Sequence, residues 1–511
     1  MHKLAETAYT IAVCLAIGLA AWCALAYAHQ PLLEAHATRQ TQTALTAYWL
    51  AENGPSLAYE TPVLGKPWSI PFELPIYQMT VALMHQITGT PLDATGRLVS
   101  FLFLLACLPH IYQILRALGF RRRAGHIFAI LFFTAPQYLF WGRSFLIETA
   151  ALFFTVAAVR YFAVYQLQGG RNRDLLLFAV TLSCALLQKV TTAAAIFGVL
   201  FLYWLYLVRP RLANRRRVAC ELAAFALSGL LTVGWLHFSD STKSYNEYGR
   251  LLTSDKLRSL TLGTPEHRLS PDLWVKVVHN RQLDNNLGGL IGIGLLLWAL
   301  AATDRRTALY VATCLFLFLA ALLAFPKLHI VHDYYQTSIT IWLLLAAAIA
   351  LAEMIDRPSM GRLGHLLLVG LVLSNLYNFL HGDYTRLTKR LHTKNHRTLI
   401  VANQIDLNTP EDSKILVLGL SWSSQIAYYA RRKALSLEPW PQTKDEVLTQ
   451  PEQFLGEPPS AVVFCPDTGR AKSRTMPDAD TLEEKLGREA YVRKPVGDCQ
   501  IFYAVDAVDA A

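Results

Sequence analysis

Residues 30–75 read QPLLEAHATRQTQTALTAYWLAENGPSLAYETPVLGKPWSIPFELP. This stretch is dense in charged, amide and hydroxyl side chains, yet it lies between a first apolar run, Tyr9–Tyr27, and a long series of further apolar runs. Loops between membrane helices are usually short, and long loops are usually functional. Short amphipathic pieces such as Thr41–Asn53 favour a position at the membrane surface. We therefore interpret the stretch as the lid of an active site.

The composition is that of a polytopic membrane protein. Of the 511 residues, 53% are hydrophobic and only 16% are charged, and the mean hydropathy is +0.30. Apolar runs long enough to cross about 30 Å of hydrocarbon recur from Tyr9 to Phe379, and the remaining segment to Ala511 is soluble in composition. The net charge of +10 does not indicate a nucleic-acid partner, because most arginines lie in short loops between apolar runs, where membrane topology explains them.

These runs predict an α-helical fold with roughly eleven transmembrane helices of about 20 residues each. The first run lacks a clear cleavage signal, so we interpret it as a membrane anchor rather than a signal peptide. We expect a transmembrane domain at residues 1–381, with a first exoplasmic loop at 29–75, and a soluble α/β domain at 382–511. Spanning helices are expected near residues 8–28, 96–116, 123–140, 145–167, 174–188, 190–208, 218–238, 286–302, 307–324, 336–355 and 362–380.

Charge decides the orientation of these helices. The apolar stretch Leu74–Ile87 is short for a span and contains polar side chains, so it is expected to stay on the outer surface. The short outer connections then hold only Arg143, Lys189 and Lys327, and the positive-inside rule places the N-terminus in the cytoplasm and the C-terminal domain in the periplasm of a bacterial inner (plasma) membrane. The inner loops hold Arg116, Arg121, Arg122, Arg123, Arg171, Arg173, Arg209, Arg211, Arg215, Arg216, Arg217, Arg305, Arg306, Arg357 and Arg362.

One basic cluster opposes this orientation, because it follows the last predicted helix on the outer side. Charge beside a long domain is weaker evidence than charge in short loops, and we expect the cluster to lie on anionic headgroups. Its members are Arg386, Lys389, Arg390, Lys394 and Arg397.

The C-terminal domain is predicted to alternate strands and helices. Lys414–Leu420, Ala461–Cys465 and Gln500–Val505 are expected to be strands, and Trp422–Lys433 and Thr481–Glu489 to be helices. No nucleotide-binding glycine pattern or metal-ligand spacing occurs, so support or acceptor recognition is the expected role.

Cysteines have two expected roles. Cys465 and Cys499 are the only pair in the C-terminal domain, and we expect a disulfide between them if that domain lies outside the cytoplasm. The other six lie in or beside apolar helices, where small buried hydrophobes are typical: Cys14, Cys23, Cys107, Cys184, Cys220 and Cys314.

Three outer basic residues break the charge bias, and each lies at a helix end beside other polar groups. Arg143 precedes Glu148, Lys189 follows a glutamine, and Lys327 precedes His332. Charge in such positions is costly unless it is paired or used. A phosphate-bearing lipid would supply a partner, since lysine and arginine bind phosphate oxygens through charge-assisted hydrogen bonds. The alternative is that each base reaches toward lipid headgroups.

Carboxylates give a second signal. Glu148 lies at the start of an otherwise apolar helix, where an unpaired charge would cost roughly 2.5 to 3.5 kcal/mol on insertion scales, so it is a functional candidate. The alternative is a structural salt bridge with Arg143. Glu34 and Glu73 in the first loop are further candidates, and the alternative for each is a solvated loop acid.

A third polar group is the run His332-Asp333-Tyr334-Tyr335. Two adjacent residues do not easily face one metal ion, and no third ligand is evident. We therefore predict hydrogen bonding of this run to a ligand or headgroup and no metal site. No cofactor is predicted, although metal dependence stays open, because the acids could hold an ion instead of a proton.

Several motifs follow one another in order along the chain. They are Arg39-Gln40-Thr41-Gln42-Thr43-Ala44, Gly65-Lys66-Pro67-Trp68, Phe72-Glu73-Leu74-Pro75-Ile76-Tyr77, Gly96-Arg97-Leu98-Val99-Ser100, Glu148, Lys189 and His332-Asp333-Tyr334-Tyr335-Gln336. This ordered set resembles the motifs of family-39-type integral-membrane glycosyltransferases. These enzymes have the GT-C fold and include protein O-mannosyltransferases and lipid A aminoarabinose transferases. The resemblance covers roughly Tyr9 to Leu380.

The resemblance implies transfer of a sugar from a polyprenyl-phosphate donor to an exoplasmic acceptor, either lipid A, a protein or an envelope glycan. In such enzymes an acid of the first loop commonly acts as the base, and Glu148 matches the position of a second acid. This chain has Arg39-Gln40 where an Asp or Asp-Glu pair is often found, so the base role falls to Glu34 or Glu73, of which Glu34 lies closer to that motif.

The chemistry of transfer assigns roles to the remaining candidates. A lipid phosphate leaves as the glycosidic bond breaks, so cations would neutralise the developing charge. A carboxylate would take the proton of the attacking hydroxyl or amine. One direct displacement is expected to invert the anomeric centre. The predicted substrate-binding set is Arg39, Gln40, Lys66, Arg143, Lys189, Lys327, His332, Asp333, Tyr334 and Tyr335.

The sequence leaves two other function classes as alternatives. A transporter or flippase for isoprenoid-linked glycans predicts internal repeats and polar residues at mid-membrane, whereas no clear repeat occurs here and the candidate polar groups gather at one face. A non-catalytic lipid-binding subunit would tolerate loss of Glu34, Glu73 and Glu148 while still needing the basic residues.

Overall fold

The computed structural model describes residues 2–209, 214–388, 396–420, 423–437, 445–466, 479–487 and 489–505. Two compact units make up the chain. The helical unit consists of Met1–His29, Ala94–Leu236 and Leu257–Thr388, and the mixed unit of Gln30–Asp93, His237–Lys256 and Lys389–Ala511. The expected domains were 1–381 and 382–511. The observed units differ from these because the first loop and residues 237–256 make their contacts with the C-terminal segment.

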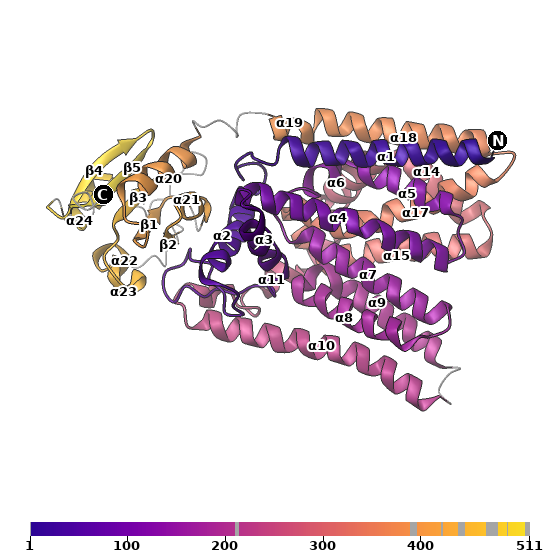
Figure 1. Ribbon diagram of the computed structural model, residues 1–511, viewed down its shortest axis with the longest axis horizontal. Coiled ribbons are helices and arrows are strands. Elements are labelled where there is room, and N and C mark those ends of the chain that lie inside the picture. The colour runs from indigo at the N-terminus through magenta and orange to yellow at the C-terminus, as the bar shows by residue number, and fades with distance from the viewer. Residues whose placement is uncertain are drawn as a thin grey trace. The chain divides into compact units, whose positions relative to one another are not determined.

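Nearly every predicted span of the helical unit carries a helix (Figure 1). Long helices alternate with short ones around residues 257–336. In chain order they are α1 (His2–Ala26), α4 (Leu92–Ala117), α5 (Arg122–Thr134), α6 (Pro136–Trp141), α7 (Glu148–Leu167), α8 (Asn172–Gln188), α9 (Val190–Val208), α10 (Arg215–Ser244), α11 (Arg258–Leu262), α12 (Pro265–Leu269), the π-helix η3 (Asp272–Asp284), α13 (Asn285–Leu287), α14 (Leu290–Ala302), α15 (Arg305–Ala324), α16 (Pro326–Val331), the 3-10 helix η4 (Asp333–Gln336), α17 (Thr337–Asp356), α18 (Gly361–His381) and α19 (Asp383–Thr388).

The apolar helices confirm a multi-pass membrane protein. Within the described residues, 8 helices are long and apolar enough to cross a membrane, or up to 9 if the pair 272–287 and 290–302, bent by 90°, is one span. The expected count of eleven is not confirmed, because α5 and α14 have 13 residues each and α8 has 17. Pro136 separates α5 from α6, as expected for a residue that disfavours a helical conformation before it.

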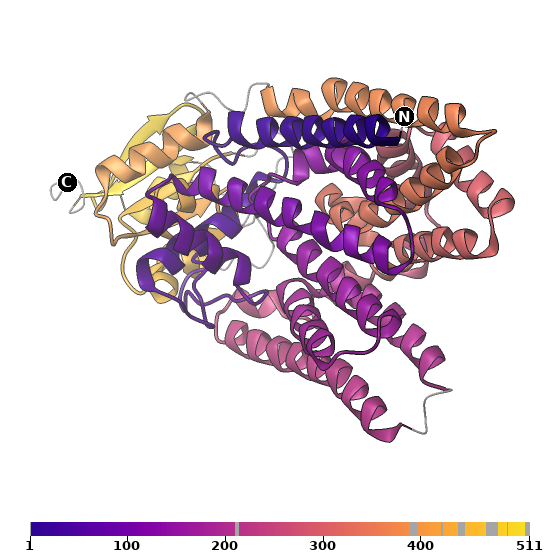
Figure 2. The ribbon, with the colours of Figure 1, turned by 45° about the vertical axis from the view of Figure 1, so that its right-hand side comes forward.

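Helix α17 is the core of the helical unit. In the apolar 18-residue stretch within residues 333–356, 94% of the residues are buried. The sequence of α17 is apolar on all sides, which is typical of a helix that is surrounded by other helices. It packs against α5, α7, α14, α15 and α18. Figure 2 shows α1 and α18 side by side at the margin of this bundle.

The mixed unit contains a five-stranded sheet with strand order β2-β1-β3-β5-β4. Strand β1 pairs in parallel with β2 and β3, whereas β5 pairs antiparallel with β3 and β4. Leu416, Leu435, Val462 and Phe502 form its buried core. The elements are α2 (Ala37–Asn53), α3 (Ile76–Thr88), the 3-10 helix η2 (Gly249–Leu252), α20 (Arg397–Asn408), β1 (Lys414–Leu418), α21 (Gln425–Tyr429), β2 (Lys433–Leu437), α22 (Asp445–Thr449), α23 (Glu452–Leu455), β3 (Ala461–Phe464), α24 (Ala479–Leu486), β4 (Tyr491–Val496) and β5 (Cys499–Ala504).

The three predicted strands of the C-terminal domain are confirmed as β1, β3 and β5, and the second predicted helix as α24, although residue 488 lies outside the described residues. The predicted helix Trp422–Lys433 is wrong over most of its length. Residues 421–422 lie outside the described residues, α21 covers only Gln425–Tyr429, and Lys433 begins strand β2. Strand β4 was missed because it is polar and contains Pro495, which an edge strand tolerates.

The first loop is built into the mixed unit. Leu64 forms an antiparallel bridge with Leu435, and the amides of Ala434 and Ser436 donate to the carbonyls of Pro62 at 3.0 Å and Val63 at 2.8 Å. Residues 62–64 thereby cover the free edge of β2, which would otherwise expose unpaired backbone groups. The long loop is thus a folded part of this unit.

Glycine and asparagine hold the loop at this edge. Gly65 has φ +74°, and a Cβ there would lie 2.7 Å from the carbonyl oxygen of Phe454, so a larger residue does not fit. The buried Asn246 donates from Nδ2 to the carbonyls of Leu64, Gly65 and Pro67 at 3.2, 2.9 and 3.1 Å. The segment 237–256 therefore belongs with the loop that it secures.

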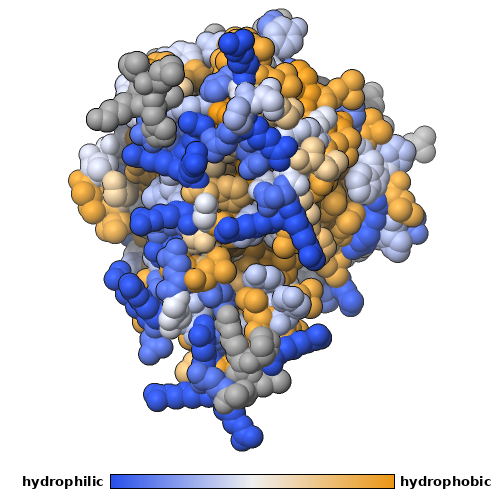
Figure 3. All heavy atoms as spheres, turned by 90° about the vertical axis from the view of Figure 1, so that its right-hand side faces the viewer, coloured by the Kyte–Doolittle hydropathy of each residue, from blue (hydrophilic) through white to orange (hydrophobic). Residues whose placement is uncertain are grey.

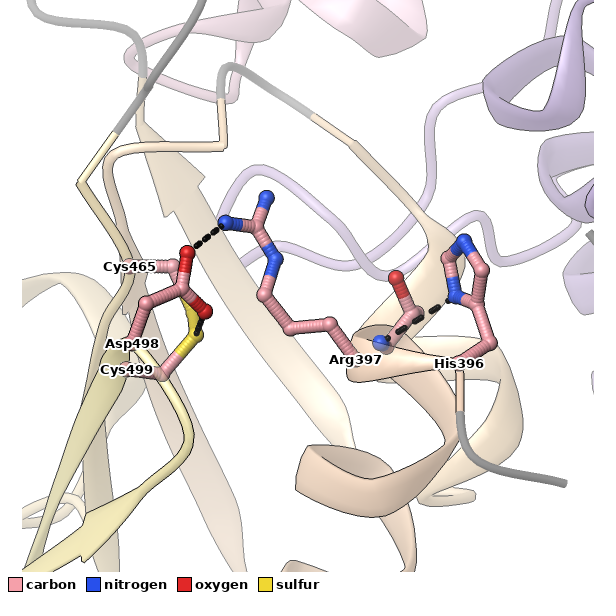
Figure 4. Close-up of a disulfide and its surroundings, with 6 residues drawn as sticks. His396, Arg397, Cys465, Asp498 and Cys499 are labelled. Atoms are coloured by element: carbon pink, nitrogen blue, oxygen red, sulfur yellow. Dashed lines mark hydrogen bonds and ion pairs between the residues drawn. A yellow bond between two sulfur atoms is a disulfide. The ribbon is translucent and has the colours of Figure 1, made fainter.

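The expected disulfide forms between Cys465 and Cys499 and joins the end of β3 to the start of β5 (Figure 4). Beside it, Asp498 accepts a hydrogen bond from Arg397 at 2.6 Å, and the His396 side chain caps α20. Of the basic cluster expected on the outer side, Arg397 is therefore paired. Lys389, Arg390 and Lys394 and the side chain of Arg386 lie outside the described residues.

Candidate active site

Glu148 is the first residue of α7 and is buried, with 3% of its surface exposed. Its Oε1 accepts a hydrogen bond from Nζ of Lys189 at 2.6 Å. Its Oε2 has no hydrogen-bond partner among the described residues. The ion-pair partner of Glu148 is therefore Lys189, and not Arg143 as the sequence alternative supposed.

Lys189 lies between two helices, because α8 ends at Gln188 and α9 begins at Val190. Its backbone is extended, and its side chain is only 7% exposed. Helices α7 and α8 pack along each other as a hairpin, so the start of α7 and the end of α8 meet at the same end of the bundle. This hairpin brings together two charged residues that are far apart in sequence.

Two residues of the motif Gly96-Arg97-Leu98-Val99-Ser100 contact the turn before α7, and a third is bonded to the end of the first helical segment. A Cβ on Gly96 would lie 1.6 Å from the ring of Phe145, so only glycine lets α4 approach this turn. Ser100 donates from Oγ to the carbonyl of Ser144 at 2.7 Å. Arg97 is fully buried and donates to the carbonyl of Ala28 at 3.0 Å. The motif thus fixes the turn from which Glu148 projects.

Aromatic rings lie against the ammonium group. Nζ of Lys189 is 3.5 Å from the ring centroid of Tyr335 and 5.4 Å from that of Tyr334. The His332 ring stacks on Tyr335 with 5.7 Å between centroids. Aromatic faces attract cations electrostatically, and the attraction increases when water is excluded. Lys189, Tyr334, Tyr335 and His332 of the predicted set therefore lie together with Glu148.

His329 belongs to this cluster and was missed in the sequence. It is 1% exposed, and its ring lies 6.3 Å from that of Tyr335. Burial, and then the positive charge of Lys189, lower the pKa of His329 to about 3, so the imidazole is neutral at physiological pH. The His329 ring therefore adds no positive charge beside Lys189. The only sequence signal was a histidine one helical turn from the polar run that begins at His332.

A buried amide network holds the segment that carries these rings. Gln336 donates to the carbonyl of His329 at 3.1 Å and accepts from Gln282 at 2.9 Å. Gln282 in turn accepts from Thr340 at 2.7 Å. Gln137 on α6 donates to the carbonyl of Asp333 at 3.3 Å. The network links η3, α6, η4 and α17. Gln336 belongs to a motif quoted from the sequence, whereas Gln137, Gln282 and Thr340 were not predicted because each is a single polar side chain in a different part of the chain.

The remaining candidates of the helical unit are less tightly grouped. Arg143 is 1% exposed and lies 5.7 Å from the ring centroid of Phe140. Lys327 is the second residue of α16 and packs against Gly263. No ion pair joins Lys327 to a carboxylate in the described part of the chain.

The mixed unit holds a second set of candidates, centred on Glu73. Both carboxylate oxygens of Glu73 lie 3.3 Å from Nη2 of Arg39, and Gln78 donates to Oε1 at 2.9 Å. Arg39 also donates to Gln42 at 2.8 Å. Tyr59 donates to the backbone carbonyl of Glu73, and burial raises the pKa of this tyrosine well above its usual value. Two predicted motifs of the first loop therefore meet in one ion pair.

Three other first-loop candidates have separate environments. Glu34 is buried, with 2% of its surface exposed. Gln40 is fully buried and donates to the carbonyl of Ala35 at 3.0 Å. Lys66 is exposed, and its backbone amide donates to the carbonyl of Phe454 at 2.7 Å.

The amphipathic piece expected at the membrane surface is part of α2. Its residues Thr41 and Thr46 are buried and form hydrogen bonds with Ser424 and Thr61, respectively.

Within the described ranges, no three histidine, cysteine, aspartate or glutamate side chains lie close enough to hold a metal ion.

Comparisons with known proteins identify the fold. Residues 77–240 match the family described as dolichyl-phosphate-mannose-protein mannosyltransferase, and no curated protein matches the chain. ArnT from Cupriavidus metallidurans, solved bound to undecaprenyl phosphate, has 14% identity and a TM-score of 0.63 over 96% of this chain and 97% of ArnT. The archaeal oligosaccharyltransferase AglB from Archaeoglobus fulgidus, solved with an inhibitory peptide and a dolichol-phosphate, has 10% identity and a TM-score of 0.59 over 90% and 69%. The mycobacterial arabinofuranosyltransferase AftD has 14% identity and a TM-score of 0.52 over 98% and 41%.

The chain therefore has the GT-C fold of integral-membrane glycosyltransferases. The family match over residues 77–240 includes Glu148 and Lys189. The resemblance predicted from the sequence motifs is confirmed.

Proposed function

We propose that this chain is a glycosyltransferase that moves a sugar from a polyprenyl-phosphate-linked donor to an acceptor on the exoplasmic side of a bacterial inner membrane. The fold supports this proposal, and so do the solved relatives, which were captured with undecaprenyl phosphate and dolichol-phosphate. The observation that carries it is the buried ion pair of Lys189 and Glu148. Burial of two charges is costly, so their retention in an apolar bundle points to use.

Lys189 has the chemistry to act on the leaving phosphate. Its ammonium group has three N–H donors, and one of these is given to Glu148. The others are available to phosphate oxygens, where they would offset the negative charge that develops as the glycosidic bond breaks. The hydrogen bond to Glu148 holds the ammonium group in place, and the ring of Tyr335 confines it on another side.

The base is proposed to be a carboxylate of the first loop, Glu34 or Glu73. It would take the proton of the acceptor hydroxyl or amine as that group attacks the anomeric carbon. Arg39 and Gln78 hold the side chain of Glu73 in a fixed orientation. Glu34 is more buried than Glu73. The remaining predicted binding residues, Arg39, Gln40, Lys66, Arg143, Lys327, His332, Asp333 and Tyr334, stay part of the proposal.

Two observations support the proposed orientation. One end of the helical unit carries many long hydrophilic side chains (Figure 3). Exposed arginines lie at helix ends of this unit, among them Arg116 at the end of α4, Arg122 at the start of α5 and Arg305 at the start of α15. The positive-inside rule assigns such an end to the cytoplasm. The disulfide of the mixed unit is typical of an oxidising compartment such as the periplasm.

Sugar transfer by purified protein in lipid nanodiscs tests the proposal. A panel of polyprenyl-phosphate sugars would be offered with an envelope extract as acceptor, and release of polyprenyl phosphate would be measured together with labelled acceptor. Wild type, Glu34→Gln, Glu73→Gln and Glu148→Gln are compared. We expect loss of transfer in Glu148→Gln and in one first-loop variant.

Each other outcome contradicts part of the proposal. Equal rates of sugar transfer by wild type and all three variants would show that none of the assigned glutamates takes part in catalysis. Movement of the intact lipid-linked sugar across the bilayer without release of polyprenyl phosphate would instead support a flippase. Retention of donor without any reaction would support a binding subunit.

A further inference from the structure

A cavity of about 420 Å³ lies in the helical unit, between α1, α4 and α5. It is lined by Thr10, Val13, Cys14, Pro109, Tyr112, Gln113, Arg122 and His126. These residues come from the start of α1, the end of α4 and the start of α5, so the cavity lies near the arginine-rich end of the bundle. The proposed transfer uses none of them.

Two features of the backbone open this space. Pro109 lies inside α4 and lacks the N–H that would bond to the carbonyl four residues earlier, which weakens and bends a helix at that point. Gly125 on α5 lets the ring of Tyr112 approach, since a Cβ there would be 2.3 Å from Cε1 of Tyr112. The tyrosine thereby lies against α5 instead of filling the cavity.

The polar groups of the cavity favour an anion. Arg122 supplies a guanidinium, and Tyr112 and Gln113 supply further hydrogen-bond donors. His126 is 5% exposed; its Nδ1 contacts the carbonyl of Arg122 at 3.0 Å, and its Nε2 lies 3.5 Å from Thr10 Oγ1. The acidic side chain of Glu6 acts electrostatically on His126 but does not line the cavity.

Arg122 differs from its neighbours in lacking a carboxylate partner. Asp356 pairs with both Arg121 and Arg123. No such pair joins Arg122 to a carboxylate among the described residues, and its side chain lines the cavity. It also lies in the first turn of α5, a helix of 13 residues that has no acidic residue in that turn. The helix dipole therefore adds to the attraction for an anion.

The apolar part of the lining fits a lipid. Val13, Cys14 and Pro109 lie beside the polar groups, and Cys14 and Pro109 are exposed on the surface of the bundle. A headgroup phosphate could enter between the helices while its acyl chains stay outside against α1 and α4. Basic pockets between transmembrane helices on the cytoplasmic side commonly bind lipid headgroups.

We propose that this cavity binds the headgroup phosphate of an anionic glycerophospholipid from the leaflet at the arginine-rich end. That this leaflet is the cytoplasmic one rests on the proposed orientation. The bound lipid would tie α1 to α4 and α5. The site is separate from the Lys189 cluster, and its test needs no sugar donor.

Lipid retention measured by native mass spectrometry tests this site. Protein is purified from nanodiscs that contain equal amounts of phosphatidylglycerol and phosphatidylcholine, and retained lipids are counted for wild type, Arg122→Gln, Tyr112→Phe and Arg121→Gln. Arg121→Gln is the matched control, because it removes the adjacent charge, which is exposed and paired with Asp356. We expect wild type and Arg121→Gln to retain more phosphatidylglycerol than phosphatidylcholine. In Arg122→Gln the ratio of the two retained lipids should be about fivefold lower.

A thermal-shift arm separates lipid from free phosphate. Phosphatidylglycerol should raise the Tm of wild type and of Arg121→Gln but not of Arg122→Gln, and inorganic phosphate should have no effect. If Arg121→Gln and Arg122→Gln lose the same amount of retained phosphatidylglycerol, the lipid is attracted non-specifically by basic loops and the proposal is overturned. A shift with inorganic phosphate alone, or equal retention of both lipids by wild type, would also overturn it.

Discussion

Nζ of Lys189 lies 2.6 Å from Oε1 of Glu148, and the two side chains are 7% and 3% exposed. Removal of one partner from a buried ion pair leaves an uncompensated charge and typically costs about 3–5 kcal/mol. Glu148→Gln or Lys189→Met alone should therefore lower the Tm, whereas the double variant Glu148→Gln/Lys189→Met should recover most of the loss. Thermal unfolding in nanodiscs measures this coupling. Additive losses would show that the two side chains do not interact.

Gly96 should be essential for the turn that carries Glu148. A Cβ at this position would overlap the ring of Phe145, and overpacking of this kind typically costs about 1–3 kcal/mol. Gly96→Ala is expected to lower both the Tm and the transfer rate. Gly198→Ala on α9 is the control, because a Cβ there meets nothing within 4 Å. Equal Tm values for the two variants would contradict the packing described for α4.

Because His329 is buried in its neutral form, the folded protein should become less stable in acid. The pKa of His329 in the folded protein is about 3, below its ordinary value of 6.5, so between these values the unfolded chain binds a proton that the folded chain does not. Above pH 6.5 the contribution of His329 to the free energy of unfolding does not change with pH. Below pH 6.5 the free energy of unfolding falls by up to about 1.4 kcal/mol per pH unit as the pH decreases toward 3. As the pH is lowered from 6.5 toward 3, the Tm of His329→Gln should fall less steeply than that of wild type. The exposed His381→Gln should retain the wild-type slope; a wild-type slope in His329→Gln would refute the assignment.

Asn246 should stabilise the first loop on the edge of β2. It is fully buried and donates to three loop carbonyls, so Asn246→Ala leaves buried acceptors unsatisfied, at a cost of about 1–3 kcal/mol. Limited proteolysis should then cleave within residues 54–75 faster than in wild type. Asn53→Ala removes only an exposed hydrogen bond to Glu60 and is the control. Unchanged cleavage in Asn246→Ala would mean that the loop is held by other contacts.

The sequence predicted the membrane helices well, because long apolar runs have few alternatives to spanning a bilayer. It also identified Glu148 and Lys189 separately, since each is a charge at the end of an apolar helix. It did not predict that they pair, because the nearer Arg143 was the obvious partner and only the α7–α8 hairpin brings Lys189 to Glu148.

Long-range pairing also explains the errors in the mixed unit. Strand β2 was not predicted, and its first residue, Lys433, was taken as the end of a helix. The pairing partners of β2, which are β1 and residues 62–65, cannot be recognised from five residues of local sequence. The buried polar side chains of α2 were taken for a membrane-surface pattern for the same reason. His329 was missed because its environment is set by Lys189 and Tyr335, which lie elsewhere in the sequence or on another helix.

Transfer by the Lys189 variant tests the central claim most directly. Release of polyprenyl phosphate from lipid-linked sugars would be measured in nanodiscs for wild type, Lys189→Met, Glu148→Gln/Lys189→Met and Glu221→Gln. Glu221 is an equally buried, ion-paired glutamate on α10, bonded to Arg217 at 2.9 Å, and controls for loss of a buried pair. We expect wild-type and Glu221→Gln protein to release polyprenyl phosphate, and both Lys189 variants to be slower by about 10²–10³-fold while remaining folded. Release at the wild-type rate by folded Lys189→Met protein would contradict the account.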